Sequence, residues 1–398
     1  MRRAARLGLL AGLLLGCAAG AAAETASSEN DLPFGWANAL KRMFDRAAPR
    51  YFVRDPVAKR ALVDAGDGLL VQLSFTGVGQ YATQSLTDRQ GLANLTSELA
   101  GARRLFEQAN GGESLISWWL RAGDIVGAPD DTQLQNEIGS VFAVNGALER
   151  KDTHIQELYW GQYFAEVVSF SLGRVDPSFR YDYSAVANDE RTQFLADPFV
   201  NSTAIPFPDP GIAFDLRWAP DPRFAVRGGI HQDNQSGRQS FDLHRDELFY
   251  AVEPVLTPSF EDLGDGNYRF LAFYSRKRDR SGAGVSLSFD QELGGGVTPF
   301  VRLSVSDSEI ADFSRFASAG LALQAPFARP EDVVAIAWAW GDPTAADARD
   351  EQLVELYYRA ALNQYVEATP NLQLVINPGR NPQDDLIGVF GFRLQATF

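Results

Sequence analysis

Apolar and polar residues alternate along most of the chain from residue 69 onward. In "AGVSLSFDQ" (283–291), the apolar residues Val285, Leu287 and Phe289 alternate with polar ones, and "VTPFVRLSVS" (297–306) repeats the pattern. A period of two is typical of a β-strand with one apolar face and one hydrated face. The pattern therefore predicts strands rather than helices.

About sixteen segments share this pattern, and their lengths are close to the ~9–11 residues with which a strand crosses a bilayer. They are 69–81, 90–101, 114–123, 154–164, 167–174, 211–219, 222–231, 245–255, 267–277, 282–291, 297–305, 314–324, 331–340, 350–362, 369–377 and 386–398. Lipid offers no hydrogen-bond partner to an open sheet edge, so the sheet must close. We predict an all-β fold: a closed antiparallel transmembrane β-barrel of outer-membrane porin type.

The connections support this count because short and long ones alternate. Counted back from the last strand, the inner turns include 219–222 and 292–296, and the outer loops include the long 175–210. A further strand-like run, 138–146, breaks the alternation if it spans the membrane, so we assign it to an outer loop. The inner turn near 255–266 is longer than the pattern leads us to expect.

A soluble β-sandwich also alternates polar and apolar faces. Two features favour the membrane barrel. The polar face carries many charges with serines and glycines between them. The apolar face ends in aromatic residues at strand tips, as in an interfacial girdle. These aromatic residues are Trp218, Tyr250, Tyr268, Tyr274 and Phe398.

The N-terminal part has a different composition. Residues 1–23 combine a basic start, an apolar core and small residues, which predicts a signal peptide for export through the inner membrane. The alternative is lipidation at Cys17, the one cysteine of the chain. Residues 24–65 are expected to form a periplasmic segment with a short amphipathic helix, and residues 66–398 the barrel domain.

Composition narrows the functional classes. The net charge is −15, and no basic face is evident, so we expect no nucleic-acid partner. The chain has three histidines, with neither a Gly-x-Ser-x-Gly elbow nor a metal-ligand spacing. His154 is expected to face lipid or the rim. We therefore predict a protein that is not an enzyme and needs no cofactor or metal.

The last strand, "VFGFRLQATF" (389–398), ends on Phe398. Its apolar residues are expected to face lipid, whereas Arg393 faces the lumen. A terminal phenylalanine on such a strand resembles the assembly signal of bacterial outer-membrane proteins. It implies two partners, the outer-membrane assembly machinery and outer-membrane lipid.

Three stretches resemble the carbohydrate-selective porins of the OprB family. They are "ELYWGQYFAEVVSFSLGRVDPSFRY" (157–181), "QFLADPFVNSTAIPFP" (193–208) and "ELYYRAALNQYVEATPNLQLVINPG" (355–379). Gly379 is followed by Arg380 where the family has a second glycine, and the match is loose over 82–153. The resemblance implies a sixteen-stranded barrel in the bacterial outer membrane, through which small neutral sugars diffuse. A general or anion-leaning porin with the same barrel is the alternative.

If the polar residues that alternate along each strand face the lumen, the inward side chains carry charges of both signs. Beside Arg223, Lys277, Glu247 and Arg393, we expect twelve residues to line the solute pathway: Glu157, Tyr159, Asp215, Arg217, Arg227, Glu253, Arg269, Asp290, Arg302, Glu355, Tyr357 and Arg359. A ring of one sign selects ions, whereas mixed charges and aromatic rings suit a neutral polyol. Alternatively, these charges brace the barrel wall.

The loop 175–210 is long enough to fold into the lumen and narrow it. Its aromatic residues and prolines predict an ordered segment. The alternative is an outward loop that packs on its neighbours.

Overall fold

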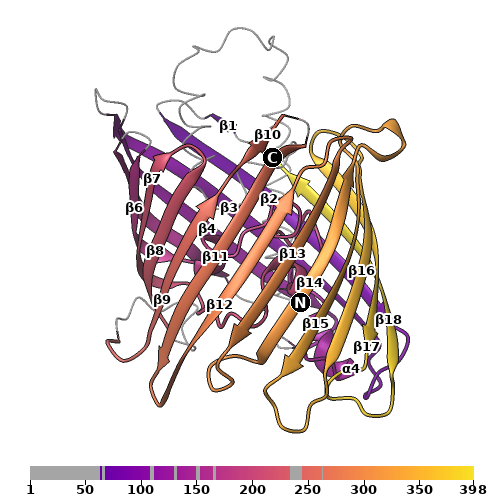
Figure 1. Cartoon of the computed structure of the whole chain (residues 1–398). Coiled ribbons are helices and arrows are strands. Elements are labelled where there is room, and N and C mark those ends of the chain that lie inside the picture. The colour runs from indigo at the N-terminus through magenta and orange to yellow at the C-terminus, as the bar shows by residue number, and fades with distance from the viewer. Residues whose placement is uncertain are drawn as a thin grey trace, which may run out of the picture.

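Antiparallel strands form the wall of the molecule in the computed structural model (Figure 1), which describes residues 63–64, 68–107, 112–129, 132–148, 153–164, 167–233, 244–261 and 263–398. The described sheet has 18 strands, of which β1 (Val63–Asp64) and β10 (Ser259–Phe260) have two residues each. The other sixteen strands are long. They are β2 (Leu69–Ala82), β3 (Gly91–Glu107), β4 (Glu113–Val126), β5 (Thr153–Phe164), β6 (Val168–Val175), β7 (Gly211–Asp221), β8 (Phe224–Gln232), β9 (Leu248–Leu256), β11 (Gly264–Lys277), β12 (Arg280–Gln291), β13 (Val297–Ser306), β14 (Phe313–Gln324), β15 (Val333–Pro343), β16 (Glu351–Ala361), β17 (Val366–Ile376) and β18 (Leu386–Thr397).

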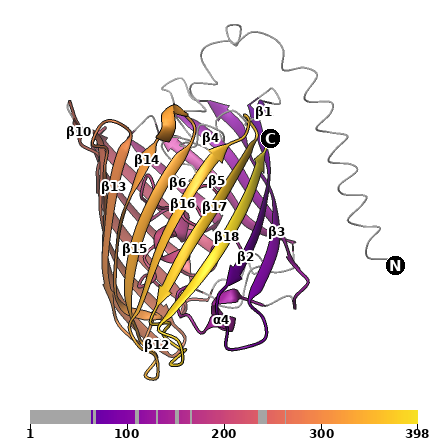
Figure 2. The same cartoon turned by 90° about the vertical axis from the view of Figure 1, so that its right-hand side faces the viewer.

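The sheet closes into a barrel because β18 pairs with β2. At this seam Phe398 donates its N–H to the carbonyl of Leu73 at 2.7 Å, and Leu73 donates to the carbonyl of Phe398 at 2.9 Å. Figure 2 shows β18 and β2 side by side on the wall. The predicted sixteen-stranded closed barrel is confirmed, and each predicted segment coincides with one long strand.

The connections alternate between the two ends of the barrel as predicted. The C-terminus lies at the same end as the turns 222–223, 292–296 and 325–332, which we call the inner-turn end. The loops 127–152 and 176–210 leave from the opposite end. Helix α4 (Leu134–Ile138) lies in the first of them, so the strand-like run 138–146 is correctly excluded from the wall.

Side chains alternate across the wall as the sequence predicts. Phe390, Phe392 and Leu394 of β18 are exposed outside, whereas Arg393 between them is 1% exposed. The outer surface is thus apolar, and the alternate, polar residues of each strand face the interior.

Two predicted orientations are wrong. Arg223 is exposed in the turn between β7 and β8 instead of facing the lumen. His154 is buried and contacts Gln156 through its Nε2 at 2.9 Å, so it lies on the same side as the inward residues. Trp119 of β4 pairs with Glu157, but the next residue, Leu120, pairs with Ile155, which marks a bulge in β5. The bulge shifts the alternation by one residue, so that the residues that face inward before Glu157 are the ones expected to face outward.

The interior of the barrel contains the two long outer loops. The loop 176–210, with η1 (Pro177–Phe179) and α5 (Asp197–Val200), is largely buried, so the predicted inward folding is confirmed. It pairs with the loop 127–152, because Gly146 donates to the carbonyl of Leu195 at 2.7 Å. The remaining short helix, η2 (Pro326–Ala328), lies in an inner turn.

An apolar cluster joins these loops to one side of the wall. Phe142 stacks on Phe313 with ring centroids 4.6 Å apart, and Phe194 meets Tyr357 edge-on at 4.9 Å. Burial of large aromatic rings supplies the free energy that holds a long loop in one conformation. The aromatic residues of the loop therefore act in packing.

The predicted signal peptide (1–23), the lipidation alternative at Cys17 and nearly all of the predicted lead-in segment (24–65) lie outside the described residues. Within the described ranges, no helix is long and apolar enough to cross a membrane.

Candidate pore constriction

Arg302 of β13 is the main anchor of the loop 176–210. Its guanidinium donates to the backbone carbonyls of Phe199 and Asp182, both at 2.9 Å, and to that of Ala187 at 2.5 Å. Its Nε lies 3.3 Å from the carboxylate of Asp182, and both side chains are fully buried. One arginine thus binds three points of the loop.

Asp182 has a left-handed backbone, with φ 55°, which asparagine and aspartate tolerate better than most residues. Its carboxylate accepts the N–H of Ser202 at 2.7 Å and the hydroxyl of Ser286 at 3.1 Å. Its own N–H donates to Glu253 of β9 at 2.8 Å. Asp182 therefore links the loop to itself and to three strands, β9, β12 and β13.

Carboxylates of the wall bind backbone N–H groups of the loop. Glu355 of β16 accepts the N–H groups of Leu195 at 2.8 Å and Ala196 at 2.9 Å. Asp290 of β12 accepts the N–H of Ala185 at 3.0 Å. A loop in a barrel cannot satisfy all its backbone groups internally, and these acceptors supply the missing partners.

The other basic and aromatic residues of the predicted site also contact this loop. Arg359 donates to the carbonyl of Thr192 at 3.1 Å, and Arg269 lies over the ring of Tyr183 at 5.0 Å. Arg269 also pairs with Glu253 at 2.7 Å.

At the β5 side, Glu157 pairs with Arg180 at 3.3 Å, and the Arg180 guanidinium lies 4.7 Å from the ring centre of Tyr159. These contacts stack a loop arginine between a carboxylate and an aromatic face. They fix the start of the loop against the wall.

The twelve predicted site residues all lie on the inner side of the wall, and at least eleven of them contact the loop 176–210. Most of them thus hold the loop in place, a role that neither the pathway prediction nor the wall-bracing alternative includes. Their part in solute passage stays a prediction.

A second group of anchors was missed by the sequence analysis. Glu351 of β16 accepts the N–H groups of Val141 at 2.8 Å and Gly379 at 2.6 Å, and Gln80 and Gln373 both donate to the carbonyl of Val144 at 2.9 Å. The contacts to Val141 and Val144 bind the loop 127–152, and the contact to Gly379 joins the connection between β17 and β18 to the same carboxylate. Its apolar run 138–146 was the available signal, because such a run indicates burial as much as a strand.

A cluster of opposite charges joins β3, β4 and the loop. Glu98 pairs with Arg121 at 2.9 Å and with Arg191 at 2.5 Å. Glu190, next to Arg191, is 5% exposed. Its burial, with a smaller contribution from Asp189, raises the pKa of Glu190 to about 7.

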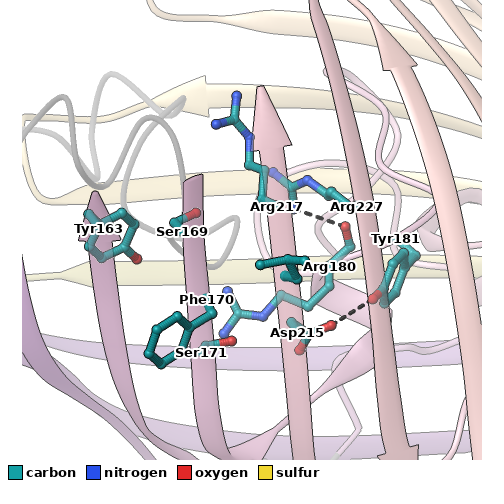
Figure 3. Close-up of a pocket in the computed structure, with 10 residues that line it drawn as sticks. Tyr163, Ser169, Phe170, Ser171, Arg180, Tyr181, Asp215, Arg217 and Arg227 are labelled. Atoms are coloured by element: carbon teal, nitrogen blue, oxygen red, sulfur yellow. Dashed lines mark hydrogen bonds between the residues drawn. The ribbon is translucent and has the colours of Figure 1, made fainter. Parts of the chain in front are cut away.

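Two hollows among the described residues lie on the inner-turn side of the loop. The first lies between β5, β6, β7, β8 and the start of the loop, and Figure 3 shows its lining. Its polar groups are Tyr163, Ser169, Ser171, Arg180, Tyr181, Asp215, Arg217 and Arg227. The second, of about 150 Å³, lies against β13–β16 and includes Tyr183, Asn188, Thr298, Tyr357 and Arg359. Both hollows combine hydroxyl groups, rings and arginines.

In the described part of the chain, no group of three His, Cys, Asp or Glu side chains is placed to hold a metal ion. Asp215 and His231 lie 3.0 Å apart, but the carboxylate oxygen that binds His231 also accepts the hydroxyl of Tyr181 at 2.6 Å. This arrangement is a structural hydrogen-bond cluster.

Solved structures with the same fold are porins. The high-pH structure of Pseudomonas putida OprB has a TM-score of 0.70 and 17% identity, covering 83% of this chain and 94% of that one. A triple mutant of Rhodopseudomonas blastica porin has a TM-score of 0.50 and 8% identity, covering 83% of this chain and 100% of that one. At these identities the likeness shows the fold.

Curated relatives are porins as well. Porin AaxA of Chlamydia abortus is 25% identical over 273 residues, which are 65% of this chain and 60% of the relative. Porin AaxA of Chlamydia caviae is 23% identical over 295 residues, 70% of this chain and 63% of the relative. The chain thus spans less than two thirds of the length of these relatives.

The family model described as "Carbohydrate-selective porin, OprB family" matches residues 130–283 and 275–398, which together exceed half of the chain. Porins of this kind are β-barrel channels of the bacterial outer membrane. With its sixteen-stranded barrel, its inward loop and this match, the chain belongs to the carbohydrate-selective porin (OprB) family.

Proposed function

We propose that this porin is a passive outer-membrane channel for carbohydrates. The observation that carries the proposal is the lining of the space beside the docked loop. It combines charges of both signs with serine hydroxyls and tyrosine rings, and is not a ring of one sign. Charged groups hydrogen-bond sugar hydroxyls, whereas a ring of one sign would select simple ions.

The docked loop supports selectivity for a solute class. Eleven of the predicted site residues hold it by direct contacts, and other wall residues such as Arg393 add to them, so a fixed segment would set the width of the passage. A narrow passage with tyrosine rings and a few placed polar groups is typical of a site that recognises a small organic solute. The name of the family points the same way.

Uptake by liposomes that contain the purified protein tests the proposal. Glucose is expected to enter faster than neutral amino acids of equal size. Equal rates for the two solute classes would refute carbohydrate selectivity and leave a general porin. Chloride conduction without sugar entry would favour the anion-leaning alternative.

A further inference from the structure

The second hollow lies over two adjacent rows of cross-strand partners, at the inner-turn ends of β13–β16. One row consists of Thr298, Ala322, Ala335 and Tyr357, and all of these but Ala335 line the hollow. The two alanines keep the middle of the row low, whereas the residues at its two ends bear hydroxyl groups. Neighbouring strands lie ~4.7–4.9 Å apart, so Thr298 and Tyr357 are roughly 14 Å apart at the backbone, which leaves room for a pyranose ring between their side chains.

The next row, toward the inner turns, extends this floor. Gln324 pairs with Val333, and Val333 pairs with Arg359. All three line the hollow, and Gln324 is exposed. The surface thus combines a small apolar area, from Ala322 and Val333, with hydrogen-bonding groups around it. A pyranose has the same two parts, because its C–H faces are surrounded by hydroxyl groups.

Tyr357 is the residue that points to a ligand. It is 2% exposed, and its ring meets that of Phe194 edge-on at 4.9 Å, so packing holds the ring in place. The side chain lines the hollow, but its hydroxyl has no hydrogen-bond partner among the described residues. Buried hydroxyl groups are nearly always hydrogen-bonded. The partner of this one must therefore lie in the hollow, as water or as a hydroxyl group of a ligand.

The inward neighbours of Tyr357 on β16 have a different role, because both bind the backbone of the loop. Glu355 accepts the N–H of Leu195 at 2.8 Å, and Arg359 donates to the carbonyl of Thr192 at 3.1 Å. The loop is thus fixed on either side of Tyr357, whose hydroxyl is left for the hollow.

The loop segment 183–193 covers the hollow and is itself ordered, since Gln193 donates to the carbonyl of Ala185 at 3.0 Å. Two charged residues line the hollow, one of each sign: Asp189, which binds Arg191 at 3.2 Å, and Arg359. A preformed site with an apolar floor and a few placed polar groups suits a small organic solute. Without a ring of one sign, it favours a neutral one.

We propose that the second hollow binds one neutral monosaccharide in its pyranose form, with a C–H face over Ala322 and Val333 and hydroxyl groups on Tyr357, Thr298 and Gln324. Its volume of about 150 Å³ accommodates several waters, each of which needs roughly 10–15 Å³, so a hexose can take their place. The inference rests on the proposed carbohydrate function and deepens it, because it assigns the solute one binding site on the inner-turn side of the loop.

The test is the block of ion current through single channels of the full-length protein in a planar bilayer. A sugar that occupies the hollow should interrupt the current, and a titration gives its half-blocking concentration. We expect glucose to block at a lower concentration than glutamine, an amino acid of similar size without net charge and without sugar hydroxyl groups.

Tyr357→Phe removes only the hydroxyl group and keeps the packed ring. It should raise the half-blocking concentration of glucose about fivefold, as expected for the loss of one hydrogen bond. Thr298→Val should have a similar effect, and Ala322→Leu, which places a large side chain on the floor, should raise the concentration further. Tyr274→Phe is the matched control, because it removes a hydroxyl group from the outer face of β11, where Tyr274 is 41% exposed.

The outcomes separate the two proposals. If glucose enters liposomes selectively but does not block, or if Tyr357→Phe leaves its half-blocking concentration unchanged, the binding site is wrong and the carbohydrate proposal survives. If glutamine blocks as well as glucose and Tyr357→Phe weakens both equally, the hollow does not recognise sugars and the inference is again overturned. If glucose neither blocks nor enters faster than amino acids of its size, the carbohydrate function itself fails.

Discussion

Arg302 and Asp182 form a fully buried pair that joins the wall of the barrel to its inward loop, with Nε 3.3 Å from the carboxylate and a guanidinium N–H 2.9 Å from the backbone carbonyl. The pair lies on the lumen side of β13, where the lining of a channel is expected. The same arginine binds the carbonyls of Phe199 and Ala187. Arg302, which the sequence pattern assigns to the solute pathway, thus holds the inward loop against the wall.

Arg302→Ala should loosen the loop 176–210 while the barrel stays folded. Removing one partner of a buried ion pair costs about 3–5 kcal/mol, because the other charge stays buried without compensation. We expect faster hydrogen exchange at loop amides and a larger, noisier single-channel conductance. Arg315→Ala is the control, since Arg315 is 67% exposed and pairs with Asp342 at the outer end of β14. Unchanged loop protection in Arg302→Ala would contradict this role.

Phe194→Ala tests the apolar contribution to the same docking. Phe194 is fully buried and contacts Phe199, Phe300 and Tyr357 with ring centroids 4.9–5.9 Å apart. The cavity should reduce docking stability by about 3–5 kcal/mol, which limited proteolysis would detect as cleavage within 176–210. Phe327→Ala, at a side chain that is 83% exposed, should leave the proteolytic pattern unchanged. Resistance of both variants would show that the hydrogen bonds alone hold the loop.

Glu190 should make loop docking depend on pH. Burial raises its pKa from 4.5 to about 7 in the docked loop. A carboxyl with a raised pKa binds its proton more tightly in the docked state, so docking is favoured at low pH and loses stability as pH rises through that interval. We expect lower protection factors of the loop amides at pH 8 than at pH 5, where the protection factor is the intrinsic exchange rate at each pH divided by the observed rate.

Glu190→Gln should remove the part of this dependence that Glu190 contributes, because the amide stays neutral. Burial raises the pKa of Asp197 in the same loop to about 7 as well, so a smaller dependence should remain. Glu309→Gln removes the same charge from an exposed loop position and should keep the wild-type profile. The measurement is the protection factor of the amides of 176–210 at both pH values in the three proteins. A wild-type loop with equal or higher protection factors at pH 8 would refute the assignment.

The wall of the barrel could be predicted from the sequence because its cause is local. Alternate residues face opposite media, so Val301 and Arg302 differ in polarity wherever the strand lies. The bulge in β5 could not be predicted in this way. The bulge depends on how Glu157 and Ile155 pair with β4, which is a relation between two separate segments of the chain. Because the sequence pattern does not show the bulge, the prediction assigned His154 to the wrong face.

The constriction was predicted only in outline. Loop length and aromatic content correctly indicated an ordered inward segment, but its anchors are backbone groups. Arg302 binds carbonyls, and Glu355 and Glu351 bind N–H groups, none of which has a signature in the sequence. The alternation of polar and apolar residues could identify these side chains as facing inward. Only the fold shows that a loop occupies the space they face.

Val301 tests the most basic assumption, that the outer face of the wall lies in hydrocarbon. It lies near the middle of β13, is 40% exposed, and has Phe289 and Ala319 as cross-strand partners. An arginine on the lipid face at the bilayer midplane costs about 2–4 kcal/mol, so Val301→Arg should lower the free energy of unfolding by that amount in urea titrations in lipid vesicles. Val301→Leu should change it by less than about 1.5 kcal/mol, as a conservative apolar exchange. Equal stability of the arginine and leucine variants would mean that water, and not lipid, covers this face, because only water accepts a guanidinium at no cost.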